Sequence, residues 1–255
     1  MLESDSAPPF LKWAGGKRWL TFRYQHLFPI QYDRYIEPFL GSGAVFFHLK
    51  PNAALLSDAN SHLVATYLQI RSNWKKVRDA LRKHDRLHSK EHYYLERARK
   101  RTAAHEKAAQ FIYLNRTCWN GLYRVNLEGI FNVPIGTKNT VCLDTDNFEA
   151  VAETLSRAEL VVSDFETVIQ RASEGDFLFV DPPSASYLTR SHPRSHCWTL
   201  SAGMRRFSLI AMNFPPTISR RICENGQGNS TVNWALPPDR GANLFAYQTY
   251  SLGKP

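Results

Sequence analysis

The hydrophobic pattern of the chain alternates between short apolar runs and longer amphipathic stretches. The short runs are rich in leucine, aromatic and β-branched residues, which is typical of buried strands in a parallel sheet. The pattern predicts strands at Tyr35–Glu37, Ala54–Ser57, Leu160–Ser163 and Phe177–Val180, and a further apolar run indicates a strand within Phe207–Met212. Strands separated by helical stretches predict an α/β fold with an open parallel sheet.

Acidic residues stand at or beside the carboxyl ends of the predicted strands. In open α/β sheets, ligands bind in a crevice beyond these ends. We therefore expect four carboxylates to line one crevice, namely Glu37, Asp58, Asp164 and Asp181.

A long helical stretch separates the second predicted strand from the third. Its apolar residues recur at steps of three and four from residue 63 to residue 81, as on an amphipathic helix, and a second helix is predicted from residue 93 to residue 108. The pattern therefore predicts two domains. Residues 1–60 and 155–255 form the sheet domain, and residues 61–154 form an inserted helical lobe.

The charge of the chain is unevenly distributed. The 255 residues include 32 lysines and arginines and 23 carboxylates, a net charge of +9 with histidine neutral. Between residues 66 and 110, 13 basic residues stand against 5 acidic ones. Such a surplus favours a polyanionic partner, with nucleic acid as the first candidate. For the helices taken alone, a solvated face that serves solubility is the alternative.

Several classes of protein are disfavoured. No run of the sequence approaches the roughly 18 apolar residues of a membrane span, and residues 1–9 are acidic and polar, unlike a signal peptide. We therefore expect a cytoplasmic protein without a membrane partner, and a monomer is compatible with the sequence. The four cysteines form no Cys-x-x-Cys pair, and His192, His196 and Cys197 lack a second spaced pair, so no metal site or disulfide framework is expected.

Two glycine-containing segments are candidates for ligand binding. In Glu37–Gly43, a strand end leads into two glycines and an apolar helix, as in a tight turn over a cofactor. The dinucleotide fingerprint would require a third glycine where Phe46 stands, which disfavours a nicotinamide cofactor. Asp58 is placed to accept hydrogen bonds from ribose hydroxyls. Lys12–Arg18 lacks the phosphate-loop spacing, so a carboxylate or phosphate clamp stays open there, and a purely structural turn is the alternative for the glycine pair.

The segment Asn115–Asn126 combines amides, guanidiniums and aromatic side chains in a non-periodic run that continues to Gly136. Core packing does not require this composition. Asparagine can pair with adenine and arginine with guanine, while aromatic side chains stack or wedge between bases. We expect base contacts from this segment, with a hydrogen-bonded loop as the alternative.

The strand Phe177–Val180 leads into Asp181, Pro182, Pro183 and Ser184. The two prolines fix an extended backbone without N–H groups, so the local carbonyls can accept hydrogen bonds from a ligand. This motif predicts a site that accepts hydrogen bonds, with a capping aspartate before a proline turn as the alternative.

In this order, the motifs resemble those of the Dam family of D12-class adenine-N6 DNA methyltransferases over residues 10–183. The motifs are WxGGK, EPFxGxG, the acid after the second strand, NRxxxNGLxRxN with FNVPxG, SDF and DPP. The resemblance implies a class I, Rossmann-like methyltransferase sheet with an inserted helical DNA-recognition lobe. It also implies S-adenosyl-L-methionine as the methyl donor, no metal, duplex DNA as the partner, GATC as the target and a bacterial or phage origin.

The resemblance assigns roles to individual residues. It implies a donor pocket formed by Trp13, Lys17, Phe39, Gly41, Gly43, Asp58, Asp164 and Phe165. It implies DNA contacts from Arg116, Asn120, Arg124 and Asn126. Asp181, Pro182 and Pro183 form the catalytic motif, in which the carboxylate and the Pro182 carbonyl accept the two hydrogens of the flipped adenine amine.

The sequence departs from the family pattern at Ser184, because the family motif is DPPY and its tyrosine stacks on the flipped adenine. Such stacking is worth about 1–3 kcal/mol, and Tyr187 stands about 10 Å further along an extended chain. The later family motifs are not recognised in residues 184–255. One hypothesis is that this divergent tail is translated from a shifted frame or is otherwise replaced.

Two other functions are open alternatives. The first is a catalytically impaired DNA-binding homologue, since DPPY is replaced by DPPS. The second is methylation of a free nucleotide or a protein side-chain amide, reactions that use related sites. The basic helical lobe argues against this second alternative, because neither substrate requires a polyanion-binding surface.

Overall fold

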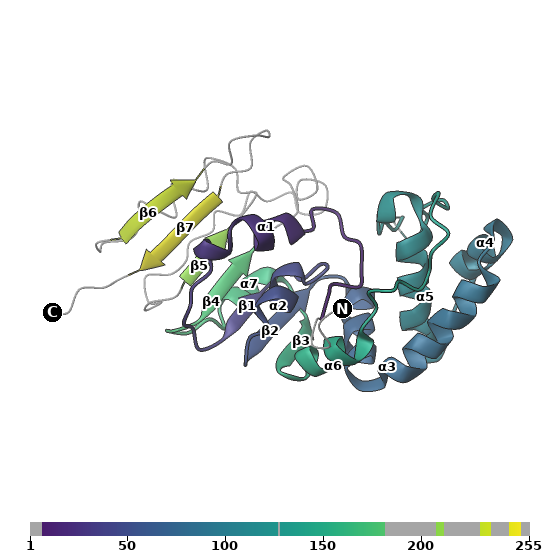
Figure 1. Cartoon of the computed structure of the whole chain (residues 1–255), viewed down its shortest axis with the longest axis horizontal. Coiled ribbons are helices and arrows are strands. Elements are labelled where there is room, and N and C mark those ends of the chain that lie inside the picture. Colours follow the sequence, from purple (N-terminus) through teal and green to yellow (C-terminus); the bar gives the residue numbers. More distant parts are fainter. Residues whose placement is uncertain (1–6, 127, 182–207, 212–229, 236–244, 251–255) are drawn as a thin grey trace. The chain divides into compact units, whose positions relative to one another are not determined.

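Figure 1 shows a computed structural model of the chain. The contacts within the chain divide it into two compact units. The described residues are 7–126, 128–181, 208–211, 230–235 and 245–250. Unit 1 contains the chain up to Arg23, Leu40–Lys50 and Asn60–Val162. Unit 2 contains Tyr24–Phe39, Pro51–Ala59 and the chain from Ser163 onward.

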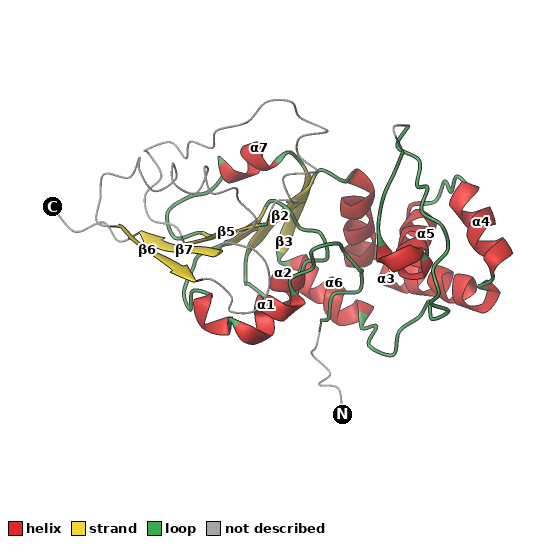
Figure 2. Ribbon diagram, turned by 90° about the horizontal axis from the view of Figure 1, so that it is seen from above, coloured by secondary structure: helices red, strands yellow, loops and turns green. Residues whose placement is uncertain are grey.

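Unit 2 is built around an open sheet whose central strands are parallel (Figure 2). Its strands are β1 (Tyr35–Glu37), β2 (Ala54–Asp58), β4 (Phe177–Val180), β5 (Ser208–Ala211), β6 (Ser230–Ala235) and β7 (Phe245–Tyr250). They lie in the order β2-β1-β4-β5-β7-β6, in which the first four are parallel to one another and β7 pairs antiparallel with both β5 and β6. The expected α/β fold is confirmed, and β5 confirms the strand predicted within Phe207–Met212.

The central strands form because their residues are apolar almost without interruption, as in sheets that are covered on both faces. Ile36 of β1, Leu55 of β2 and Phe177 of β4 are completely buried. Helix α7 (Phe165–Ile169) contacts β2, and the short helix η1 (Gln25–Leu27) precedes β1. The core of unit 2 therefore lies on the strands predicted from the sequence.

Unit 1 is mainly helical (Figure 2). Its elements are α1 (Arg18–Arg23), α2 (Ala44–Leu49), α3 (Ser61–Leu87), α4 (Lys90–Ala98), α5 (Ala104–Thr117), η2 (Trp119–Gly121), α6 (Phe148–Ser156) and β3 (Ala158–Val162). Helix α3 packs against α5 and α6, and α4 packs against α5. Strand β3 contacts α3, where Arg71 donates a hydrogen bond to the Ala158 carbonyl at 2.9 Å.

Helix α3 organises unit 1. It begins after Asn60, whose side chain accepts hydrogen bonds from the backbone N–H groups of His62 and Leu63 and so satisfies two donors of the first turn. Asn73 interrupts the helical backbone with φ −141°.

Across the part of the chain that the structure describes, no helix combines the length and the apolar character that a bilayer crossing requires.

The compact units divide the chain differently from the predicted domains. Besides the helices of residues 61–154, unit 1 includes β3 and the segments that carry α1 and α2. Compactness groups residues by contact, whereas the predicted division concerns function. The assignment of residues 61–154 to DNA recognition therefore stays a prediction.

Candidate active site and recognition segment

The sheet order of unit 2 reverses beside β1, because β2 lies on one side of this strand and β4 on the other. In open α/β sheets, ligands bind beyond the carboxyl ends of the strands at such a reversal. Ile36 pairs with Leu178, and Phe39 and Asp181 each follow their strand's paired residue by three positions. The register thus brings Phe39 and Asp181 to the edge where a ligand site is expected.

Asp181 lies near a buried tyrosine–glutamate pair in β1. The Tyr35 hydroxyl donates a hydrogen bond to Glu37 Oε2 at 2.9 Å, and both residues are buried. Burial raises the pKa of Tyr35 well above its usual range, and the negative charges of Glu37 and Asp181 raise it further. Glu37 is therefore buried and hydrogen-bonded within the sheet, whereas Asp181 is half-buried at the end of β4. The other predicted catalytic residues, Pro182 and Pro183, lie outside the described residues, as does Ser184.

Two predicted donor residues of unit 2 form an aromatic pair. The rings of Phe39 and Phe165 are stacked, with their centroids 5.3 Å apart and their planes at 26°. Ser57 donates a hydrogen bond to the Pro38 carbonyl at 3.1 Å, which ties the end of β2 to the chain leaving β1. Half-buried Asp58 follows directly. The structure thus brings Phe39 and Phe165 together and places Asp58 at the carboxyl end of β2.

Asp164 caps helix α7. Its Oδ1 accepts a hydrogen bond from the Thr167 backbone N–H at 2.9 Å, and its Oδ2 accepts one from the Thr167 hydroxyl at 2.7 Å. These bonds favour the charged form, so the pKa of Asp164 lies below its usual range. Although the side chain is exposed, it already has a structural role that orients Phe165, the first residue of α7.

The remaining predicted donor residues lie in unit 1. The arm, defined as Lys12–Lys17, turns where the Gly16 N–H donates to the Trp13 carbonyl at 3.1 Å. Buried Lys17 donates to the Gly15 carbonyl at 2.6 Å. The arm therefore holds an ammonium group within a tight turn.

Gly41 is required both by its backbone and by its neighbour. It has φ +49°, and a Cβ atom at this position would lie 2.7 Å from Trp13 Cδ1. The Tyr67 hydroxyl donates to the Gly41 carbonyl at 2.9 Å. Gly43, with φ +63°, precedes the first residue of α2. The structure thus brings Trp13 and Gly41 into direct contact.

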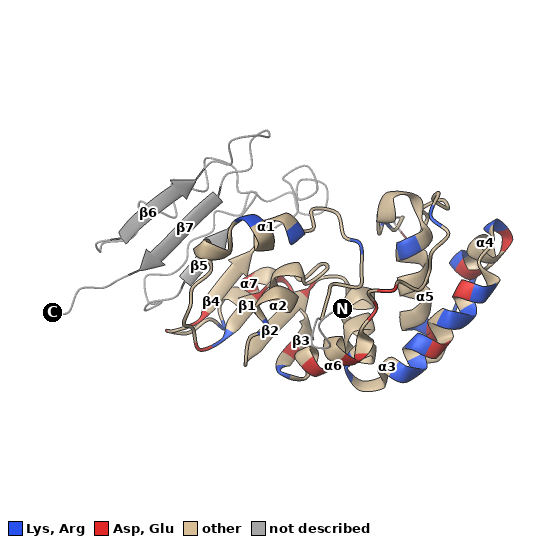
Figure 3. Cartoon of the chain, in the orientation of Figure 1, with Lys and Arg blue, Asp and Glu red and all other residues tan. Residues whose placement is uncertain are grey.

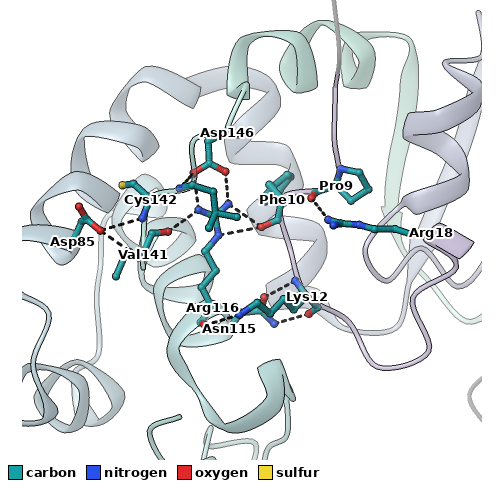
Figure 4. A network of polar contacts seen from close by, with 11 residues as sticks. Pro9, Phe10, Lys12, Arg18, Asp85, Asn115, Arg116, Val141, Cys142 and Asp146 are labelled. Atoms are coloured by element: carbon teal, nitrogen blue, oxygen red, sulfur yellow. Dashed lines mark hydrogen bonds and ion pairs between the residues drawn. The ribbon is translucent and has the colours of Figure 1, made fainter. Parts of the chain in front are cut away.

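Arg116, expected to contact DNA, instead lies inside unit 1 (Figure 4). Its side chain is 1% exposed and forms two hydrogen bonds of 2.6 Å with the carboxylate of Asp146. Its guanidinium also donates two hydrogen bonds to the Phe10 carbonyl and one to the Val141 carbonyl. All five N–H groups of the guanidinium are therefore engaged, and in this structure none is presented to DNA.

The other predicted DNA contacts belong to the recognition segment, defined as Trp119–Asn126. Asn120, with φ +54°, and Arg124 are exposed. The Asn126 side chain accepts hydrogen bonds from the backbone N–H groups of Glu128 and Ile130. Asn126 thus shapes a turn, while Arg124 extends from it with one hydrogen bond of 3.3 Å to Asn132.

Apolar side chains are also exposed on this segment. Trp119 is 51% exposed, and Leu122 and Val125 are each 39% exposed. Lysines and arginines gather along α3 and α4 of the same unit (Figure 3). Unit 1 therefore presents both the aromatic and amide groups that can read bases and a basic helical surface that can bind phosphates.

Sequence reasoning missed the role of Asn115. Its side chain is completely buried in the last turn of α5 and bonds to the Lys12 backbone. The available signal was helical spacing, since Asn115 follows Phe111 by four residues and Arg116 follows Ile112 by four. Both polar residues therefore continue a buried apolar face.

A polar cluster lies between α3, α4 and α5. His84 Nδ1 and His92 Nε2 are 3.1 Å apart, and Glu96 lies close enough that the three could share a metal ion. Buried Glu96, however, is paired with Arg99 at 3.1 Å and with Arg101 at 2.6 Å. Two guanidiniums on the one carboxylate disfavour a cation there, so the cluster's hydrogen bonds and ion pairs indicate a structural role.

A parallel sheet with an order reversal beside β1, and with an aspartate at the carboxyl end of β4, is an open α/β arrangement that fits a Rossmann-like methyltransferase fold. The family profile described as D12 class N6 adenine-specific DNA methyltransferase matches residues 13–197. The chain belongs to this family. The resemblance read from the sequence motifs is thereby confirmed.

Individual relatives agree with this assignment. The Type II methyltransferase M1.LlaDCHI of Lactococcus lactis subsp. cremoris is 40% identical over 184 residues, which cover 69% of this chain and 65% of the relative. The DNA adenine methylase of Serratia marcescens is 36% identical over 181 residues, with 69% and 66% covered. The DNA adenine methylase of Vibrio cholerae is 28% identical over 239 residues, with 86% of each chain covered. The chain thus spans slightly less than two thirds of the first two relatives.

Proposed function

We propose that the protein transfers a methyl group from S-adenosyl-L-methionine to N6 of adenine in duplex DNA, with GATC as the target sequence. The observation that carries this proposal is the position of Asp181. It follows β4 at the carboxyl edge of the sheet, beside the reversal of strand order, and directly precedes Pro182 and Pro183. We expect the protein to act in the cytoplasm of a bacterial or phage-infected cell.

The chemistry requires hydrogen-bond acceptors at the adenine amine. The N6 lone pair is delocalised into the ring, so the amine is a weak nucleophile. The Asp181 carboxylate and the Pro182 carbonyl would accept its two hydrogens and orient the lone pair toward the methyl group. Because positive charge develops on N6 as its bond to carbon forms, these hydrogen bonds strengthen in the transition state. The surplus proton then leaves N6 through Asp181 or water.

The donor supplies a methyl group on a positively charged sulfur, which keeps the bonding electron pair when the methyl group leaves. In unit 1, the contact between Trp13 and Gly41 would shape an aromatic wall, and Lys17 and Gly43 would fix the turns around it. In unit 2, Phe39 and Phe165 offer stacked rings. Asp58 and Asp164 would accept hydrogen bonds from the donor. These roles rest on the family resemblance, and the contacts within each unit support them.

For DNA recognition, we propose base or phosphate contacts from Asn120, Arg124 and Asn126 and phosphate contacts from the basic surface of α3 and α4. The exposure of Asn120 and Arg124 supports this role. For Arg116, we propose a structural role, since its donors are all engaged within unit 1. The target adenine must leave the base stack before it can reach an acceptor site.

The experiment measures transfer of a labelled methyl group from S-adenosylmethionine to unmethylated duplex DNA. One duplex contains GATC and a matched duplex lacks it. We expect incorporation into the first duplex only, and its loss in Asp181→Ala with donor binding retained. Undiminished transfer by Asp181→Ala would refute the catalytic assignment.

A second candidate is a DNA-binding homologue with impaired catalysis, favoured by Ser184 in place of the stacking tyrosine. It predicts salt-sensitive duplex binding without methyl transfer. The coding DNA tests the origin of the tail. A DPPY-containing family sequence in another frame would support a shifted frame, and its absence would refute that hypothesis.

A further inference from the structure

One buried amide joins the arm to the recognition segment. Asn115 Oδ1 accepts a hydrogen bond from the Lys12 N–H at 2.9 Å, and its Nδ2 donates to the Lys12 carbonyl at 2.8 Å. The same Nδ2 donates to the Gly121 carbonyl at 3.4 Å. A single side chain therefore holds the backbones of both segments.

The two backbones also pack closely. Gly121 has φ +65°, and a Cβ atom there would lie 2.8 Å from the Lys12 side chain. The Lys12 ammonium donates to the Arg116 carbonyl at 3.0 Å. Neither segment can shift far at this point without disturbing the other.

Tyr123 makes a second connection. Its ring stacks on Trp13, with centroids 5.9 Å apart and planes at 15°, and it also contacts Phe111 at 4.8 Å. Burial raises the pKa of Tyr123 to about 12, and a hydrogen bond with the Asn60 side chain opposes this shift. Asn60 caps α3 and follows Asp58 by two residues. Tyr123 thus connects the recognition segment to the arm, through Trp13, and to the start of α3, through Asn60. Both contacts lie at or next to predicted donor residues.

We propose that Tyr123 and Asn115 are positioning residues that couple donor binding to DNA binding. This inference rests on the proposed function. The neighbours of Tyr123 in the recognition segment, Leu122 and Arg124, are exposed, so the stack on Trp13 anchors this stretch. A donor that immobilises Trp13 also immobilises Tyr123. This lowers the conformational entropy that the recognition segment loses when DNA binds afterwards. Because linkage is reciprocal, bound DNA strengthens donor binding by the same factor.

The experiment measures the dissociation constant of S-adenosylhomocysteine, an unreactive probe of the donor site, with and without saturating GATC duplex. We expect the duplex to tighten probe binding to the unaltered protein at least about fivefold. In Tyr123→Leu and Asn115→Ala, we expect this factor to fall within about twofold of unity, while binding of the probe alone changes by less than about threefold. Tyr123→Phe keeps the stack and should retain most of the coupling.

The matched control is Arg124→Ala, an exposed neighbour of Tyr123 without a ring contact to the arm. The Arg124→Ala protein should need more duplex for saturation. At saturation, the duplex should tighten binding of S-adenosylhomocysteine by the same factor as in the unaltered protein. Thermal unfolding identifies variants that fail to fold, and the isosteric Asn115→Asp, which puts an acceptor oxygen in place of the Nδ2 donor, then replaces Asn115→Ala. Unchanged coupling in the folded Tyr123→Leu protein overturns the inference.

The outcomes also separate the two proposals. An unaltered protein that methylates GATC duplex but shows no coupling contradicts this inference and leaves the proposed function intact. A folded protein that binds neither probe nor duplex contradicts the proposed function itself, and with it the coupling.

Discussion

Arg116 and Asp146 form a two-point ion pair inside unit 1, with both N–O distances 2.6 Å. The pair joins the end of α5 to the residues that precede α6, and the same guanidinium holds the backbone of Phe10. Arg116 therefore links three chain segments, namely the end of α5, the residues before α6 and the N-terminal segment at Phe10. Its effect should therefore be visible in stability before it is visible in DNA binding.

Arg116→Ala should lower the free energy of unfolding by about 3–5 kcal/mol, because it leaves the Asp146 carboxylate without its buried partner. Urea denaturation followed by circular dichroism measures this loss. Arg157→Ala is the matched control, since that arginine is exposed and its partner Glu153 is 3.9 Å away. We expect less than about 1 kcal/mol there. Full stability of Arg116→Ala together with weakened DNA binding would restore the DNA-contact role.

Gly41→Ala should weaken donor binding as well as stability. Alanine at φ +49° costs about 1–2 kcal/mol of backbone strain, and its methyl group would meet the Trp13 ring. Gly129→Ala is the control, since Gly129 also has positive φ, +75°, but an added Cβ there has no neighbour within 4 Å. Calorimetric titration with S-adenosylhomocysteine should show weaker binding to Gly41→Ala only. Equal binding by both variants contradicts a role of the Trp13–Gly41 contact in the donor site.

Asp164 allows its capping role to be separated from its proposed donor role. Asp164→Ala removes the bonds to Thr167 and should cost about 1 kcal/mol of stability. Asp164→Ser keeps an oxygen that can accept the Thr167 N–H bond, so stability should largely return. If the carboxylate also binds the donor, affinity for S-adenosylhomocysteine stays reduced in Asp164→Ser. Recovery of both properties in Asp164→Ser would assign Asp164 to capping alone.

Strands β1, β2 and β4 were predictable because burial on both faces leaves a clear apolar run. Tyr35–Glu37 and Phe177–Val180 were predicted with the bounds that the structure has, and β2 extends one residue further, to Asp58. The positions of Asp58 and Asp181 at the carboxyl ends of their strands follow from the same pattern, whereas Phe39 was assigned to the site by the family resemblance. The hydrophobic pattern thus placed these two carboxylates at the strand ends, and their role in a site stays a prediction.

The roles of polar residues in unit 1 were less predictable. Amides and guanidiniums suggest DNA contacts by their chemistry, and this chemistry is the same whether the partner is a base or a backbone carbonyl. Arg116 and Asn115 satisfy backbone carbonyls of a segment more than a hundred residues away in the sequence, Phe10 and Lys12 respectively. No local pattern reports such distant partners.

His84 makes the stability of unit 1 dependent on pH. Burial lowers its pKa from 6.5 to about 4, against the charge of Glu96, which raises it. His92 and Arg101 lower the pKa further, Glu106 raises it, and the His84 ring stacks on Tyr113. The unfolded chain takes up a proton near pH 6.5 and the folded chain only near pH 4. The stabilisation by neutral His84 is therefore complete above pH 6.5 and is lost as the pH falls from 6.5 to 4.

Thermal or urea unfolding between pH 7.5 and 4.5 measures this effect. Within the window, the contribution of His84 should change by up to about 1.4 kcal/mol per pH unit. His84→Gln removes the titrating ring, so its stability should depend less steeply on pH, although it is lower at pH 7.5 because the contacts with His92 and Tyr113 are lost. His62→Gln, an exposed change in the same helix, should keep the original dependence. An equally steep dependence in His84→Gln would place the titrating group elsewhere, with His92 as the nearest candidate, since burial lowers the pKa of that residue too.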